Sequence, residues 1–146
     1  MKEDIMHLLK LNNQILRSTQ VHLDKMLKEY DLSSGSYPYL LMLRGNEGIS
    51  QNKISEEVGC DKAMSARTIT KLIDIGYIIR NKDEDDSRAY KLYLTQKAKV
   101  IIPKVLYKIH KLVELITKDL NEEEKRTTIN SLSKVLNSVK KMKIQG

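Results

Sequence analysis

The apolar residues recur at intervals of three and four along most of the chain, a spacing that predicts a mainly helical protein. The first such segment, residues 5–30, contains no glycine or proline and is predicted to be one long helix. A turn over residues 31–35 follows it. Three shorter helices are predicted next, at residues 38–44, 50–58 and 61–75. Ser50 caps the second of these and Asp61 the third, and a glycine follows the last residue of each.

After the fourth predicted helix the pattern changes to alternation, which predicts two β-strands at residues 77–80 and 89–94. Between them lie only polar residues, 81–88, which are too many for a tight turn and are predicted to form a projecting loop. Two more helices complete the order, one capped by Thr95 and one that begins at Asn121 with a capping box. The last helix carries an apolar stripe made of Ile129, Leu132, Leu136 and Val139.

Two short helices across a tight turn, followed by a hairpin with a projecting loop, have the layout of a winged helix-turn-helix. Successive helical residues are about 100° apart. In the fourth helix the apolar residues therefore gather on one side: Ala66, Ile69, Leu72 and Ile73. The opposite side carries short residues and two cations, with Thr68 at its edge: Ala63, Met64, Arg67 and Lys71. Such a face fits a DNA major groove, about 12 Å wide; the alternative is an ordinary solvated helix surface.

Further motifs follow one another in a fixed order and spacing: residues 50–62 (SQNKISEEVGCDK), Arg67, residues 72–78 (LIDIGYI), Asp83 to Arg88 (DEDDSR) and Leu94-Thr95. Together they resemble the MarR family of winged-helix regulators (multiple antibiotic resistance regulators). In that family these positions form the first helix and turn, the recognition-helix arginine, the exit into the wing, the acidic wing and the start of the next helix. The resemblance extends over nearly the whole chain, taken as one MarR-like domain of residues 1–146.

The resemblance implies that residues 33–94 form the DNA-binding region, with the helix-turn-helix at about residues 50–76 and the wing at residues 77–94. It also implies an all-helical dimerisation region built from both chain ends, residues 1–30 and 95–146. The long terminal helices agree with this, because a monomer would leave their apolar stripes in water. The alternative is a bundle of these helices inside one subunit.

The resemblance further implies that Arg88 enters the minor groove and that Asp86 holds it in place. A narrow minor groove concentrates negative potential, and a carboxylate can fix a guanidinium through two contacts. The alternative for this pair is an ordinary surface ion pair. The chain departs from many family wings at Ser87, where they carry a second arginine, and it lacks their proline earlier in the loop.

Composition and charge narrow the function classes. The net charge is +7, and residues 100–146 contribute the largest share, which favours a polyanionic partner; a lysine-rich solvated surface is the alternative. The single Cys60 excludes an internal disulfide framework, and the longest apolar run is far too short to span a membrane. We expect a cytoplasmic protein that does not associate with membranes.

The sequence thus predicts a homodimeric, sequence-specific regulator of transcription that binds double-stranded DNA, most simply a repressor released by a ligand. The rival hypothesis is a protein-interaction module with the same winged-helix fold. No catalytic set, metal site or cofactor motif is found, so an enzyme is not expected. The predicted DNA contacts are Ser50, Gln51, Lys62, Ala63, Met64, Arg67, Thr68, Lys71, Asp86 and Arg88.

Two smaller features have alternative interpretations. Tyr37 and Tyr39 flank Pro38, near where the family places its small-molecule cleft, so they are candidates to line a pocket for a small aromatic or other organic effector. Core or interface packing is the alternative for both tyrosines. Cys60 precedes a helix N-terminus, where the helix dipole can lower the pKa of a thiol, which makes it either a redox sensor or a small packed residue.

Overall fold

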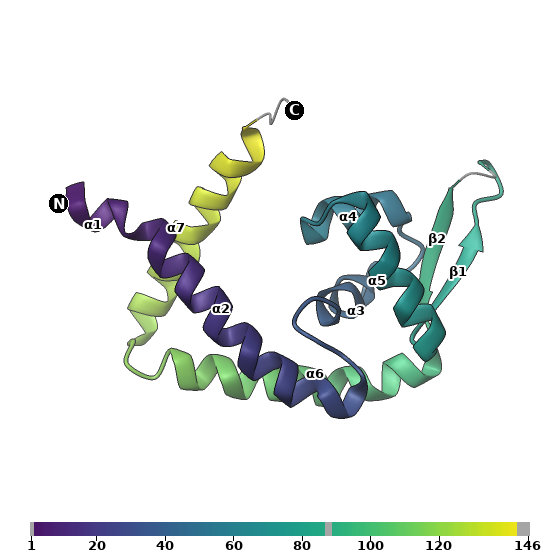
Figure 1. Ribbon diagram of the computed structural model, residues 1–146, viewed down its shortest axis with the longest axis horizontal. Helices are drawn as coiled ribbons and strands as arrows, with labels where there is room; N and C mark the ends of the chain where they lie inside the picture. Colours follow the sequence, from purple (N-terminus) through teal and green to yellow (C-terminus); the bar gives the residue numbers. More distant parts are fainter. Residues whose placement is uncertain (1, 87–88, 143–146) are drawn as a thin grey trace. The chain divides into compact units, whose positions relative to one another are not determined.

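The computed structural model describes residues 2–86 and 89–142, and it divides the chain into two compact units, Met1–Lys108 and Ile109–Gly146. The elements, shown in Figure 1, follow in the order α1 (Lys2–Met6), α2 (Leu8–Leu27), a 3₁₀ turn η1 (Lys28–Tyr30), α3 (Tyr37–Leu43), α4 (Gln51–Val58), α5 (Lys62–Ile75), β1 (Ile78–Lys82), β2 (Tyr90–Leu94), α6 (Gln96–Ile116) and α7 (Glu122–Lys141). The prediction of a mainly helical chain with one hairpin is therefore confirmed.

The N-terminal segment is not the single helix predicted for residues 5–30. The backbone N–H of His7 bonds to the carbonyl of Asp4, three residues back, at 3.2 Å, and this tighter turn separates α1 from α2. At the other end the chain tightens into η1, and Asp31 stops it with a φ of +58°. Aspartate tolerates this left-handed conformation better than most residues. The apolar periodicity did not reveal either change of helix geometry.

Helices α4 and α5 begin and end at the positions predicted from their capping residues and the glycines that follow them. The Ser50 hydroxyl accepts a hydrogen bond from the Lys53 N–H at 3.0 Å, and the Asp61 carboxylate accepts one from the Met64 N–H at 2.8 Å. Gly59 and Gly76 end the two helices with φ values of +82° and +96°. A side chain at these angles would be strained, which is why glycine ends each helix.

The hairpin is antiparallel and begins one residue later than predicted, with Ile78 opposite Leu94 and Lys82 opposite Tyr90. The segment before α4 pairs with the other side of β2. The Gly48 N–H donates to the Leu92 carbonyl at 2.8 Å, and the Leu92 N–H donates to the Ile49 carbonyl at 3.1 Å. The hairpin is therefore tied by backbone hydrogen bonds to the chain that enters the helix-turn-helix.

The core of the first unit is aliphatic apart from two buried tyrosines. Its most deeply buried apolar side chains come from α2, α3, α4, α5, β1, β2 and α6: Leu27, Tyr39, Leu40, Leu43, Ile54, Ile69, Leu72, Ile78, Leu92, Ala98 and Val105. Helices α3, α4 and α5 thus share one core with the hairpin and the first half of α6. This common core fixes the position of α5 within the unit.

The second unit contains the end of α6 and the whole of α7. The predicted capping box is present: the Asn121 side chain accepts from the Glu124 N–H at 2.8 Å, and the Glu124 carboxylate accepts from the Asn121 N–H at 3.0 Å. No side chain of α7 is buried in the described part of this unit. The predicted apolar stripe is exposed, at 64% for Ile129, 45% for Leu132, 51% for Leu136 and 55% for Val139.

Candidate nucleic-acid interface

Helix α5 has one buried side and one exposed side. Ser65, Ile69 and Leu72 are fully buried, whereas Ala66 and Ile73 are half-buried. The exposed side carries five of the predicted contacts: Lys62, Ala63, Met64, Arg67 and Lys71. Thr68 is half-buried, and its hydroxyl donates to the Met64 carbonyl at 3.0 Å. The face predicted to enter a major groove therefore exists, with Thr68 less available than its neighbours.

The buried side of α5 contains a polar residue that the apolar pattern did not identify. The Ser65 Oγ lies 2.9 Å from the Tyr39 hydroxyl, and both residues are fully buried. Burial is the main cause that raises the pKa of Tyr39 above its ordinary value of 10.0. Tyr39 is thus a core residue bonded to α5, as in the alternative given for it, and it does not line an open cleft.

The start of α4 lies beside strand β2 of the wing. Ser50 caps the helix and forms a β-bridge with Lys91, so its hydroxyl is already engaged as an acceptor. Gln51 is half-buried, and its Oε1 atom is buried without a hydrogen-bond partner among the described residues. A hollow of about 220 Å³ lies here, lined by Ser50, Gln51, Asn52, Ala89 and Tyr90.

The wing loop is described up to Asp86 and again from Ala89. Backbone hydrogen bonds close it: the Asp83 N–H donates to the Ala89 carbonyl, and the Ala89 N–H donates to the Asp86 carbonyl, both at 3.0 Å. Asp86 is exposed, as predicted. Ser87 and Arg88 lie outside the described residues, so the predicted contact between Asp86 and Arg88 remains a prediction.

The exposed cations near this surface differ in whether a carboxylate neutralises them. Lys53 on α4 is paired with Glu57 at 3.3 Å. In contrast, none of the cations on α5 and β1 forms an ion pair with another described residue: Lys62, Arg67, Lys71, Arg80 and Lys82. Their charge therefore remains available to a polyanion.

Arg80 was missed by the sequence reasoning. Its guanidinium carbon lies 4.5 Å from the centroid of the Tyr90 ring, a cation–π contact within the hairpin. The signal was present in the strand pattern, because alternation places residues of paired strands on a common face. The strand pairing that brings these two residues together depends on how many residues form the loop between β1 and β2. The sequence pattern alone did not determine that number.

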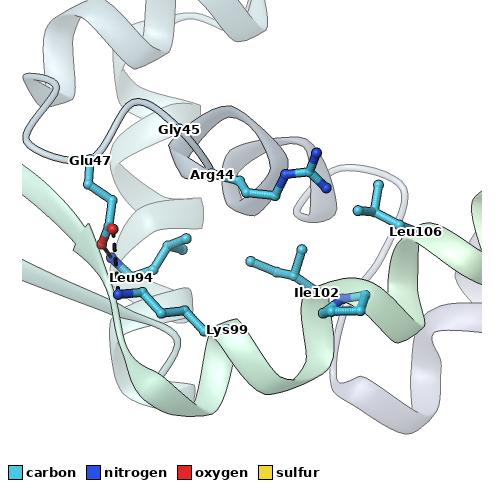
Figure 2. A pocket seen from close by; sticks show the side chains of 8 residues that line it. Arg44, Gly45, Glu47, Leu94, Lys99, Ile102 and Leu106 are labelled. Carbon is cyan, nitrogen blue, oxygen red and sulfur yellow. Dashed lines mark hydrogen bonds and ion pairs between the residues drawn. The ribbon is translucent and has the colours of Figure 1, made fainter.

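A second hollow, of about 390 Å³, lies in the first unit between the end of α3, the end of β2 and α6 (Figure 2). The hollow is lined by Arg44, Gly45, Glu47, Leu94, Lys99, Ile102, Pro103 and Leu106. On its rim the Glu47 carboxylate accepts the Leu94 N–H at 2.8 Å and pairs with Lys99 at 3.5 Å. The Arg44 side chain is exposed, so the hollow combines an apolar wall with one accessible cation.

Two other expectations concern metals and membranes. No cluster of three or more potential metal ligands occurs among residues 2–86 and 89–142. Within the same residues, no helix has the length and apolar character needed to cross a bilayer. Cys60 is a half-buried free thiol at the turn between α4 and α5.

The geometry defines a winged helix-turn-helix protein: α4 and α5 meet across a glycine turn, and the hairpin follows α5 directly. Comparison with known proteins agrees. A sequence model of the MarR family matches residues 32–90. The HTH-type transcriptional regulator BilQ of Clostridioides difficile (strain CD3) is 31% identical over 116 residues, which make up 80% of this chain and 78% of BilQ.

Solved structures show the same likeness. A MarR transcriptional regulator from Methanosarcina mazei Go1 has a TM-score of 0.85 and 32% identity, covering 91% of this chain and 96% of that one. A mutant MarR from E. coli, solved with operator DNA, has the same fold, with a TM-score of 0.82 and 22% identity over 91% of this chain and 96% of that one. The chain belongs to the MarR family and is a helix-turn-helix regulator of transcription rather than an enzyme.

Proposed function

We propose that the chain is a homodimeric, sequence-specific regulator that binds an inverted-repeat operator in double-stranded DNA and represses transcription until a ligand releases it. The observation that carries the DNA-binding part is the exposed face of α5, which presents Arg67 and Lys71 without any neutralising carboxylate among the described residues. The E. coli MarR mutant, which has the same fold and was solved with operator DNA, supports the proposal that this chain binds an operator.

The roles of the contacts follow from their chemistry. Arg67 lies in the middle of the exposed face, and its planar fork matches the O6 and N7 acceptors of guanine. Lys71 lies one turn later and suits a phosphate. Lys62, Ala63, Met64 and Thr68 complete the surface in the groove. Ser50 and Gln51 lie near the DNA backbone. Arg88 enters the minor groove, and Asp86 holds it in place.

Dimerisation is supported by apolar side chains that each unit leaves exposed. In the first unit these side chains belong to α1 and α2: Ile5, Met6, Leu9, Leu11, Ile15, Leu16 and Val21. In the second unit they belong to the end of α6 and to α7: Val113, Leu115, Ile116, Ile129, Leu132, Val135, Leu136, Val139 and Met142. Such stripes are costly in water and are covered when two copies pair about a two-fold axis.

Release by a ligand requires a site on the protein where an effector can bind. Because Tyr39 is part of the core, the better candidate for an effector site is the hollow beside Arg44, where an apolar wall and a cation suit an organic anion (Figure 2). An occupant there would touch the segment that follows α3, the end of β2 and helix α6. The rival hypothesis, a module that binds a protein and not DNA, gives no reason for the cations on α5 that form no ion pair with another described residue.

The decisive experiment is selection of bound duplexes from a random pool, followed by titration of the selected duplex at several salt concentrations. We expect an inverted repeat with half-sites about 10 base pairs apart or a small multiple of that. The affinity for it should fall steeply with salt. Enrichment of no duplex would favour the protein-interaction role.

A further inference from the structure

Arg80 and Tyr90 lie on the two strands of the wing hairpin, Arg80 in the middle of β1 and Tyr90 at the loop end of β2. In the hairpin Arg80 is paired with Leu92 and Lys82 with Tyr90, so Arg80 and Tyr90 are diagonal neighbours on one face. The guanidinium carbon lies 4.5 Å from the ring centroid, and the arginine remains exposed to solvent. The ring thus restricts the side chain without shielding its charge.

No carboxylate among the described residues competes for this guanidinium. Lys53 on α4 and Lys99 on α6 are also exposed, but Glu57 pairs with the first at 3.3 Å and Glu47 with the second at 3.5 Å. Within residues 2–86 and 89–142, the Tyr90 ring is the only partner of the Arg80 guanidinium. A cation that is fixed in place but not neutralised is suited to an anion supplied by a partner.

The Tyr90 ring also joins Arg80 to the start of α4. The same residue lines the hollow of about 220 Å³ together with Ser50, Gln51 and Asn52. The β-bridge between Ser50 and Lys91 fixes the start of α4 against β2. The first turn of α4 contains no acidic residue, so nothing in it opposes an anion near Arg80.

We propose that Arg80 is a phosphate contact of the wing hairpin, positioned by Tyr90, and that it binds the DNA backbone beside the first turn of α4. This inference rests on the proposed DNA-binding function and adds to it a contact outside the recognition helix and the wing loop. Arginine can meet two phosphate oxygens with its fork. Because the ring already restricts its rotamers, less conformational entropy is lost on binding. The contact carries no base information, so it strengthens binding equally on all sequences.

The first test compares Arg80→Ala with Lys53→Ala, a variant that removes the same charge from a residue already paired with glutamate. Binding to the selected operator is titrated at several salt concentrations. We expect Arg80→Ala to lose roughly tenfold in affinity and to lower the salt slope by about one unit, with the base preference unchanged. Lys53→Ala should stay within about twofold of the wild type, because its charge is compensated locally.

The second test locates the phosphate. Single linkages of the operator are replaced by neutral methylphosphonates, one position at a time. At one linkage per half-site, the neutral replacement should lower the affinity of the wild type. The same replacement should not lower the affinity of Arg80→Ala further, because that variant already lacks the phosphate contact. Tyr90→Phe keeps the ring and should bind like the wild type, whereas Tyr90→Leu should reproduce part of the Arg80→Ala defect and add little to it in the double variant.

The outcomes separate this inference from the proposed function. A wild-type protein that binds no duplex would overturn the function and the inference together. If the wild type binds its operator but Arg80→Ala binds it with the same affinity and the same salt slope, only the inference is wrong. A change of base preference in Arg80→Ala would also contradict it, because a phosphate contact does not discriminate between bases.

Discussion

The hydroxyl of Tyr39 on α3 lies 2.9 Å from the Oγ of Ser65 on α5, and both side chains are fully buried. This hydrogen bond joins residues 26 positions apart and holds α5 to the core on the side opposite its exposed face. Because each hydroxyl satisfies the other, neither leaves an unpaired polar group in an apolar surrounding. The orientation of Arg67 and Lys71 therefore depends on a contact that lies beneath them.

The Tyr39–Ser65 bond predicts how the fold responds to its loss. Tyr39→Phe leaves the Ser65 hydroxyl buried without this partner, so we expect it to lower the free energy of unfolding by about 1–2 kcal/mol. Adding Ser65→Ala should recover part of that loss, because the stranded hydroxyl is then removed. Urea unfolding of the two single variants and the double variant measures this. Strictly additive losses would show that the two hydroxyls are not coupled.

The same tyrosine predicts a dependence on pH. Burial raises its pKa in the folded protein above the ordinary value of 10.0, so the neutral phenol is favoured by folding. This contribution to stability is complete below pH 10.0 and is lost as the pH rises through the folded pKa. Tyr39→Phe should therefore lose stability less steeply than the wild type in urea unfolding above that pH.

The exposed face of α5 predicts two different kinds of binding defect. Arg67→Ala should cost roughly 1–3 kcal/mol and relax the preference at one base pair per half-site. Lys71→Ala should weaken all sequences about equally and lower the salt slope by about one unit. Titrations on the operator and on duplexes altered at single positions separate the two. A uniform loss in Arg67→Ala would make Arg67 a phosphate anchor and contradict the proposed position of the helix in the groove.

The buried Oε1 of Gln51, which has no hydrogen-bond partner in the part of the chain that the structure describes, predicts a conflict between stability and binding. A buried acceptor without a partner costs roughly 1–3 kcal/mol, so Gln51→Met should be at least as stable as the wild type in thermal unfolding. The same change removes a predicted DNA contact and should weaken operator binding. The exposed neighbour Asn52 provides the control, since Asn52→Ala should change stability by less than about 0.5 kcal/mol. A clearly destabilised Gln51→Met would mean that the amide is satisfied in solution.

The apolar stripe of α7 predicts the oligomeric state. Leu132 is 45% exposed on that stripe, so Leu132→Glu should place a charge in the proposed dimer interface and yield folded monomers in sedimentation velocity. Lys134 is exposed on another side of the same helix. Lys134→Glu should remain dimeric, which controls for the added negative charge. A wild type that is already monomeric would favour the alternative of a bundle within one subunit, and dimers that persist in Leu132→Glu would show that this stripe does not form the interface.

The sequence by itself determined the elements whose ends depend on nearby residues. Ser50, Asp61 and Asn121 each cap a helix through an N–H three residues later, and Gly59 and Gly76 end helices through their own backbone angles. These interactions are local, so the residue types and their spacing are sufficient to predict them. The exposed face of α5 followed in the same way from a period of about 3.6 residues.

The tertiary structure decided the features that depend on residues far apart in the sequence. The burial of Ser65 requires Tyr39, 26 positions away, and the stacking of Arg80 requires a strand register that places Tyr90 beside it. Gln51 has a buried Oε1 because the start of α4 lies against β2. Periodicity ranks positions by hydrophobicity alone, so it cannot show which polar side chain finds a distant partner or which cation remains unpaired. Those partners exist only once the elements pack together, and for this reason the contacts beneath and beside the recognition helix became visible only in the folded chain.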